Sequence, residues 1–304
     1  MQYDRGVPSD RTATHELDDA SSVFAAVRPR LFGIAYRMLG SVSEAEDIVQ
    51  EAWVKWQTYD RSVVREPAAF LATTTTRLSI NAAQSARARH ETYIGPWLPE
   101  PVDTSADPEL GAERGEALEI AVLLLLEKLT PTERAAYVLR EAFDYPYGQI
   151  ADIIQVSEQS ARQLVSRART HVRGERRAPV TAPEQRRLLE AFLAAAQTGD
   201  LTALERLFAA DVVSYSDGGG VRNVSRIPVV GRATVAKFLR AFAGRFWPGI
   251  EIRWIEANGR PSALLIRDGV PTAFVTIDAS AQGIDRLLWV MNPVKITGFG
   301  PPAP

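Results

Sequence analysis

A basic helix-turn-helix pattern between residues 147 and 173 contains the side chains with the clearest capacity for specific chemistry. Its segment YGQIADIIQVSEQSARQLVSRARTHVR places amides, a hydroxyl and guanidinium groups on one side of its second predicted helix, at Gln159, Arg162, Gln163, Ser166, Arg167 and Arg169. Guanidinium groups pair with phosphates and guanine, and amides pair with adenine. These residue types indicate DNA binding, although a solvated basic surface would show the same pattern.

Two short helices must position these side chains. The first is predicted at about residues 148–155, and Ser157 is expected to cap the second. Apolar residues recur in the second helix at the i, i+3, i+4 and i+7 spacing of a buried stripe, at Ala161, Leu164, Val165 and Ala168. The polar residues lie on the opposite face, where a recognition helix meets the major groove.

Composition excludes several other classes of protein. The chain has 304 residues, of which 46% are hydrophobic and 24% charged, as expected for a multi-domain soluble protein. It has no cysteine, so disulfides and thiolate metal sites are excluded. The longest apolar run, residues 120–126, is too short to cross a membrane, and we predict a cytoplasmic protein without membrane contact.

The net charge of −2 is unusual for a DNA-binding protein, but the charge is unevenly distributed. Residues 150–178 contain six arginines against three acidic residues, and residues 61–91 contain five against two. An acidic, proline-containing stretch lies between them, and we interpret it as a linker. Two basic modules joined in this way indicate contact with nucleic acid at two places.

The module before the linker is predicted to be helical throughout. Apolar periodicity predicts a helix over residues 22–39 that ends at Gly40. Ser43, with Glu46 three residues later, predicts a capping box at the start of a second helix. A third helix is expected from Pro67 to Arg89.

These segments carry a family resemblance. RLFGIAYRMLGSVSEAEDIVQEAWVKW resembles region 2 of bacterial sigma factors, and LTPTERAAYVLREAFDYPYGQIADIIQVSEQSARQLVSRAR resembles region 4 of the extracytoplasmic-function (ECF) group. The motifs WLPEP, DGGG and NPVKI are similar to those of a subgroup with a SnoaL-like carboxy-terminal extension. The residues of these motifs that the resemblance marks as regulatory are Trp97, Leu98, Pro99, Glu100, Pro101, Asp217, Gly218, Gly219, Gly220, Asn292, Pro293 and Lys295. The chain departs from that pattern at Val221 and Val294, where the subgroup usually has lysine and aspartate.

The resemblance implies a multi-domain protein, with two all-α sigma-factor modules followed by an α+β SnoaL-like (NTF2-like) cone. The expected limits are 17–95 for region 2, 96–115 for the linker with WLPEP, 116–177 for region 4 and 184–304 for the SnoaL-like domain. The sequence of the last domain agrees, since it predicts helices over 184–198, 200–208 and 231–246, and strands over 212–215, 250–257, 263–266, 272–277 and 284–291.

The resemblance also implies a function and two partners. A sigma factor directs core RNA polymerase to specific promoters, and the extension would regulate it in cis. Asp47, Gln50 and Glu51 would bind core polymerase. The residues that would face the minus-ten element of promoter DNA are Arg77, Asn81, Arg87 and Arg89, while region 4 reads an upstream element.

A cone-shaped domain has a pocket, which leaves two other functions open. One is a ligand-responsive DNA-binding regulator whose SnoaL-like domain senses a small molecule, with candidate lining residues Phe238, Trp254, Phe274 and Trp289. The other is a vestigial enzyme fused to DNA-binding helices. No histidine follows residue 180 to act as a general base. We therefore predict no catalytic residue, no metal and no cofactor.

Overall fold

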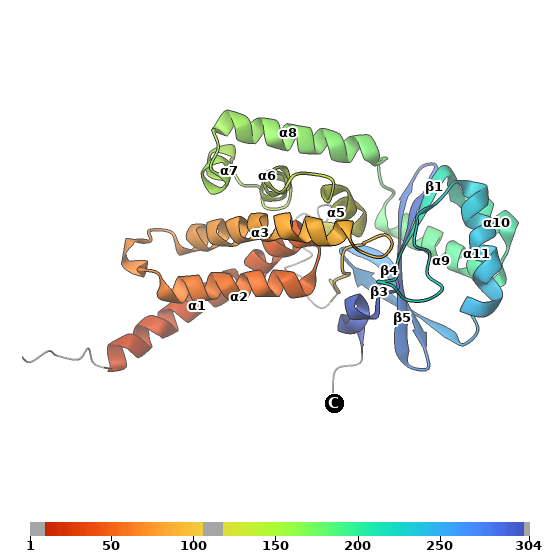
Figure 1. The fold of residues 1–304 in the computed structure, drawn as a ribbon, viewed down its shortest axis with the longest axis horizontal. Helices are drawn as coiled ribbons and strands as arrows, with labels where there is room; N and C mark the ends of the chain where they lie inside the picture. The colour runs from red at the N-terminus through yellow and green to blue at the C-terminus, as the bar shows by residue number, and fades with distance from the viewer. Residues whose placement is uncertain (1–9, 106–117, 301–304) are drawn as a thin grey trace, which may run out of the picture.

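The computed structural model describes residues 10–105 and 118–300. The first helical module consists of α1 (Asp10–Leu39), α2 (Val42–Thr58), a short 3-10 turn η1 (Arg61–Val63) and α3 (Pro67–Glu91). The second consists of α5 (Ile120–Leu126), α6 (Pro131–Glu141), α7 (Tyr147–Ile154) and α8 (Glu158–Glu175). Figure 1 shows the two modules packed along one another, with α8 at the outer edge and the carboxy-terminal domain at one end.

The boundary between α1 and α2 differs from the predicted one. Gly40 ends α1 in the left-handed conformation (φ 67°), and Ser41 is the N-cap of α2, with its hydroxyl accepting a hydrogen bond from the backbone N–H of Glu44. The prediction of a capping box on Ser43 is therefore wrong. Because the left-handed turn at Gly40 leaves Ser41 extended, the cap lies two residues before the predicted one and the helix begins at Val42.

The two helical modules share one hydrophobic core. It contains Leu31 and Met38 of α1, Trp56 of α2 and Leu71 of α3, together with aliphatic residues of the second module that include Leu126, Val138, Leu139, Ile150 and Val165. Side chains from both sides of the linker are therefore buried against each other, so the modules form a single compact body.

The carboxy-terminal domain places three helices against a six-stranded sheet (Figure 1). The helices are α9 (Ala182–Thr198), α10 (Leu201–Leu207) and α11 (Arg232–Phe246). The strands are β1 (Phe208–Asp217), β2 (Val229–Val230), β3 (Ile250–Ala257), β4 (Arg260–Arg267), β5 (Val270–Ser280) and β6 (Gly283–Val290), in the spatial order β2-β1-β6-β5-β4-β3. The predicted α+β architecture is confirmed, and β3 to β6 form the expected antiparallel meander.

The sheet buries both of its faces against different partners. One face packs on the helices of its own domain through residues such as Leu265, Ile277 and Leu287. The alternate residues Leu264, Phe274 and Leu288 point the other way and pack with Leu98 and Ile120. The carboxy-terminal domain is thus joined to the helical modules by the outer face of its sheet.

The predicted lining of a pocket in the cone is half correct. A cavity of about 70 Å³ lies beside Phe238 and Trp289. Phe274 faces the opposite side of the sheet, and Trp254 packs beneath the guanidinium of Arg186, 3.7 Å from its ring centroid. The alternation of side chains along β5 places Phe274 away from the cavity.

No helix among residues 10–105 and 118–300 combines the length and apolar character that crossing a bilayer requires. Within the same ranges, no cluster of three or more histidine, aspartate or glutamate side chains is arranged to bind a metal.

Candidate nucleic-acid interface and interdomain junction

The helix-turn-helix is formed by α7 and α8. Helix α7 ends at Gln155 in the left-handed conformation, and the backbone N–H of Val156 donates to Ala151 O at 3.0 Å. Ser157 then caps α8, its hydroxyl accepting from the N–H of Ser160 at 3.1 Å. This turn directs one side of α8 into the shared core and the other into solvent.

The residues predicted to face DNA lie together on the outer side of α8. Gln159, Arg162, Gln163, Ser166 and Arg167 are exposed, and Arg169 is half-buried. The guanidinium groups are paired with carboxylates: Arg162 with Glu158 at 2.5 Å, Arg167 with Glu133 at 3.1 Å and Arg169 with Glu141 at 2.6 Å. Burial alone would raise the pKa of Glu133, but hydrogen bonds from Thr130 and Arg167 lower it overall.

The candidate DNA-binding residues on α3 make different contacts from those on α8. Arg77 donates from Nε to Ile153 O at 2.9 Å and from Nη2 to Asp152 O at 3.0 Å, so it caps the carboxyl end of α7. Asn81 is exposed, and Arg89 forms an ion pair with Glu44. The Arg87 side chain lies outside the described part of the structure. Arg77 is therefore engaged by the second module, although it is exposed and lies one helical turn before Asn81 on α3.

The candidate polymerase contacts form a ridge on α2. Asp47, Gln50 and Glu51 are exposed, whereas Ile48 and Val49 between them are buried. Glu51 also pairs with Lys55 one turn later at 3.4 Å. The three side chains of this ridge face solvent.

WLPEP, DGGG and NPVKI meet at one buried ion pair. The carboxylate of Asp217 is fully buried; it accepts hydrogen bonds from Lys295 Nζ at 2.7 Å, Leu98 N at 2.9 Å and the Tyr93 hydroxyl at 2.5 Å. Lys295 also donates to Leu98 O at 2.5 Å and lies 4.3 Å from the ring centroid of Trp97. We name these five residues the Asp217 junction.

The electrostatics of the Asp217 junction follow from its burial. Burial lowers the pKa of Lys295, with the opposite charge of Asp217 acting against that shift. Burial and the neighbouring Asp217 carboxylate raise the pKa of Tyr93. A buried ammonium and carboxylate stabilise each other only as a pair, so either alone would be costly.

The glycines of DGGG allow the end of strand β1 to approach the NPVKI motif closely. Gly219 has φ 55°, and a Cβ there would lie 2.5 Å from Asn292 Nδ2, which itself donates to the Tyr93 hydroxyl at 2.8 Å. Gly218 and Gly220 flank this contact, and Pro293 begins the final 3-10 segment η3 (Pro293–Phe299). A side chain at position 219 would separate the strand end from NPVKI.

The remaining WLPEP residues attach the linker to the start of α2. The Glu100 carboxylate accepts from the N–H of Val42 at 2.9 Å, and its carbonyl accepts from the Tyr36 hydroxyl at 2.6 Å. Trp97 stacks on His90 with ring centroids 3.9 Å apart. Leu98 and Pro101 are buried, as is Pro99 beside Gly40. The linker therefore joins the end of α1 to the sheet.

The sequence did not predict Tyr93 as part of the junction, nor a second polar contact, between the end of region 4 and the carboxy-terminal domain. Arg176, just after α8, pairs with Glu119 and with Asp278 at 3.0 Å, and Arg177 pairs with Asp211 at 2.7 Å. Both arginines were counted in the basic segment 150–178, yet they bind the carboxy-terminal domain. Their partners are far away in sequence, so no local pattern could identify them.

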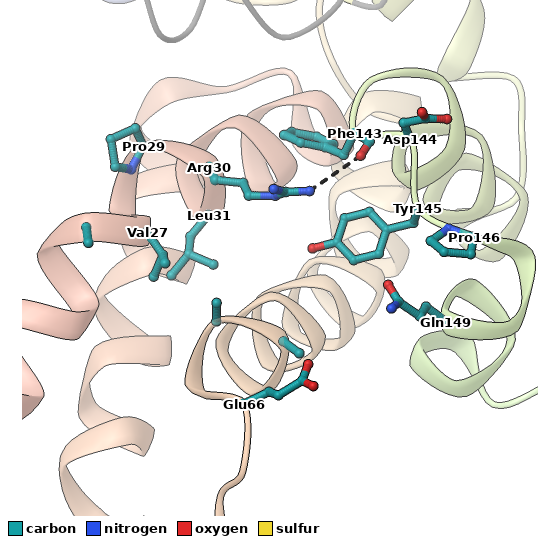
Figure 2. Close-up of a pocket in the computed structure, with 13 residues that line it drawn as sticks. Val27, Pro29, Arg30, Leu31, Glu66, Phe143, Asp144, Tyr145, Pro146 and Gln149 are labelled. Carbon is teal, nitrogen blue, oxygen red and sulfur yellow. Dashed lines mark hydrogen bonds between the residues drawn. The ribbon is translucent and has the colours of Figure 1, made fainter.

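The first and second modules also enclose a cleft of about 620 Å³, shown in Figure 2. Arg30 of α1 reaches across it, donating to Phe143 O at 3.4 Å, with its guanidinium 5.0 Å from the ring centroid of Tyr145. Arg30 and Arg77 thus bridge the two modules at different points.

Comparison with known proteins identifies the family. The model of sigma-70 region 2 matches residues 23–89, and that of sigma-70 region 4 matches residues 119–172. The chain belongs to the ECF RNA polymerase sigma factors. The two family matches show this, together with a relative that aligns along most of the chain.

That relative is the ECF RNA polymerase sigma factor SigJ of Mycobacterium tuberculosis, 37% identical over 91% of this chain and 93% of its own length. Its crystal structure matches with a TM-score of 0.75 and 33% identity, covering 92% of this chain and 99% of that one. A probable ECF sigma factor of the same organism, SigI, is 34% identical over 62% of this chain and 66% of its own length. The function expected from the sequence, a sigma factor, is confirmed, and the comparisons do not support the alternative of a ligand-responsive regulator.

Proposed function

We propose that the carboxy-terminal domain regulates this sigma factor in cis by holding regions 2 and 4 in the compact arrangement. The observation that carries this proposal is the Asp217 junction, where a carboxylate from β1 and an ammonium from η3 both bind the backbone of Leu98. Leu98 lies in the linker between regions 2 and 4. Fixing it limits how far the regions can separate.

The position of Arg77 supports a restraining role. Its guanidinium would bind promoter DNA under the sigma-factor assignment, but here it donates to two carbonyls at the end of α7. Two of its five N–H donors are engaged at α7, which holds the guanidinium against the second module. The contact keeps α3 of region 2 close to α7 of region 4, as the proposal requires.

In vitro transcription with purified core polymerase tests the proposal. Asp217→Asn removes the charge at the junction with little change in shape, and we expect more promoter-specific transcript than from the natural chain. Asp268→Asn is the matched control, because Asp268 is exposed in the turn between β4 and β5 and has φ 52°, which asparagine also accepts. A chain limited to residues 1–178 should likewise differ from the full chain. Equal transcription from all four proteins would refute regulation in cis.

We also propose which residues meet each partner. Asp47, Gln50 and Glu51 bind core RNA polymerase. Promoter DNA is bound by region 2 through Arg77, Asn81, Arg87 and Arg89, and by region 4 through Gln159, Arg162, Gln163, Ser166, Arg167 and Arg169. The proposed domain limits are 17–95, 96–115, 116–177 and 184–304, and no residue has a catalytic role. In support, the polymerase ridge and the outer side of α8 both face solvent.

A further inference from the structure

The exposed side of α8 has an uncharged ridge between charged flanks. Successive residues of an α-helix are rotated by about 100°. The residues opposite the buried stripe of Ala161, Val165, Ala168 and Val172 are therefore Gln159, Gln163, Ser166 and Thr170, and all four are exposed. Arg162 and Arg169 lie on one flank of this ridge, and Arg167 lies on the other. The part of α8 that projects farthest carries amides and hydroxyls.

The ridge and the flanks also differ in how their polar groups are satisfied. No hydrogen bond joins the Gln159 or Gln163 amide to another residue in the described part of the chain. Three flanking guanidinium groups have carboxylate partners, Glu158 for Arg162, Glu133 for Arg167 and Glu141 for Arg169. The amides can reach a base without breaking a contact, whereas these three arginines already donate to carboxylates.

The chemistry of an amide selects one base. A glutamine side chain donates to N7 and accepts from the N6 amine of adenine, while an arginine pairs with O6 and N7 of guanine. In a helix-turn-helix, the N-terminal half of the recognition helix contacts the base edges. Gln159 and Gln163 both lie in that half, because α8 begins at Glu158.

We infer that Gln159 and Gln163 read two adenines of the upstream promoter element, and that the flanking arginines contact phosphates. This inference rests on the proposed function, because α8 must enter the major groove. Four residues of helix span about 6 Å, and base pairs are about 3.4 Å apart. The two A·T pairs therefore lie within about two base-pair steps of each other, on either strand.

Transcription from a promoter library tests the inference with the full chain and purified core polymerase. Promoters active with the natural chain are selected first, and each base pair of their upstream element is then varied. We expect adenine to be preferred at two nearby positions by roughly 5- to 150-fold, the discrimination that one bidentate contact provides. Gln163→Ala should abolish the preference at one of these positions only, and Gln163→Arg should change it to guanine.

Arg162→Ala is the matched control, since Arg162 is adjacent in sequence and also exposed but lies on the flank. It should lower transcription from every library member by a similar factor and leave the order of base preferences unchanged. Circular dichroism and thermal unfolding of the variants should match the natural chain, because all the altered side chains are exposed.

The outcomes separate the two hypotheses. Upstream elements without A·T pairs at nearby positions, an adenine preference that survives Gln163→Ala, or base preferences altered by Arg162→Ala would each overturn the inference and leave the proposed function intact. Absence of any promoter-specific transcript, from the natural chain and from Asp217→Asn alike, would overturn both.

Discussion

Where α6 packs against α1 and α3, regions 2 and 4 meet largely through aliphatic side chains, with the buried guanidinium of Arg134 donating to Arg37 O at 3.0 Å. The sheet, in contrast, meets the linker at the buried ion pair of Asp217 and Lys295. Leu31 of α1, Leu71 of α3 and Leu139 of α6 belong to the core that the two regions share and are fully buried. The second contact has an apolar part around Leu98 and Phe274, but its geometry is fixed by the ion pair. Apolar packing tolerates small shifts, whereas a buried ion pair tolerates neither the loss of a partner nor much displacement.

The largest expected effect comes from the charged contact. Lys295→Met leaves the carboxylate of Asp217, which is fully buried, without a cation, and we expect a loss of about 3–5 kcal/mol in the free energy of unfolding. Urea unfolding followed by circular dichroism measures it. Lys237→Met is the control, because Lys237 is exposed on α11, and it should change stability by less than about 0.5 kcal/mol. Equal effects of the two changes would mean that the ion pair does not fix this contact.

The apolar contact predicts a comparable but more variable loss. Leu139 is fully buried on α6, and Leu139→Ala should cost about 2–5 kcal/mol through lost burial and the cavity left behind. The same urea experiment measures this cost. Repeating it at high salt distinguishes the apolar contact from the charged one more clearly. A cavity cost should not depend on ionic strength, so a large salt dependence would contradict the assignment of an apolar contact.

Arg77 is one of the polar contacts between regions 2 and 4, together with Arg30 and Arg134, and its substitution is expected to have a smaller effect on stability. Arg77→Ala removes two hydrogen bonds from the end of α7 and should cost about 1 kcal/mol. Hydrogen–deuterium exchange should become faster at the last turn of α7 and remain unchanged in the sheet. Arg77→Lys keeps the charge but not the two-point geometry and should restore only part of the protection. Unchanged exchange in both variants would show that Arg77 does not hold the regions together.

The smallest expected effect concerns pH. The hydrogen bond from Arg177 holds the pKa of Asp211 below its ordinary value of 3.8. A carboxylate whose pKa is lower in the folded state stabilises the folded state at any pH above its ordinary pKa. That contribution is lost as the pH falls through the pKa of the folded state. Below about pH 4, the natural chain should therefore lose slightly more stability than Asp211→Asn. Parallel pH profiles from thermal unfolding would contradict this expectation.

Local sequence patterns predicted which helices and strands are present better than they predicted the first and last residues of each. The helices and the meander were predicted from periodicity and turn residues, and region 4 was confirmed as a helix-turn-helix. Helix α1 begins twelve residues before the predicted start, since residues 10–21 lack an apolar stripe. Strand β1 extends over Phe208–Asp217 because it pairs in parallel with β6, a partner that lies more than sixty residues away.

The candidate sites depended still more on tertiary contacts. The resemblance associated WLPEP, DGGG and NPVKI, but it did not identify Tyr93 or show that Lys295 would neutralise Asp217. The departures Val221 and Val294 are both exposed, so they leave that ion pair intact. The position of Arg77 against α7 depends on how two modules pack, which no spacing within α3 encodes.

The Asp217 junction has a consequence for the timing of synthesis. Regions 2 and 4 are complete in sequence at about residue 172, but Lys295 lies more than one hundred residues later. At about 5–20 residues per second, the nascent regions exist for roughly 6–25 s before the ammonium that fixes the linker has been translated. Each newly made molecule therefore passes through a period in which its promoter-binding regions are present and this restraint is not.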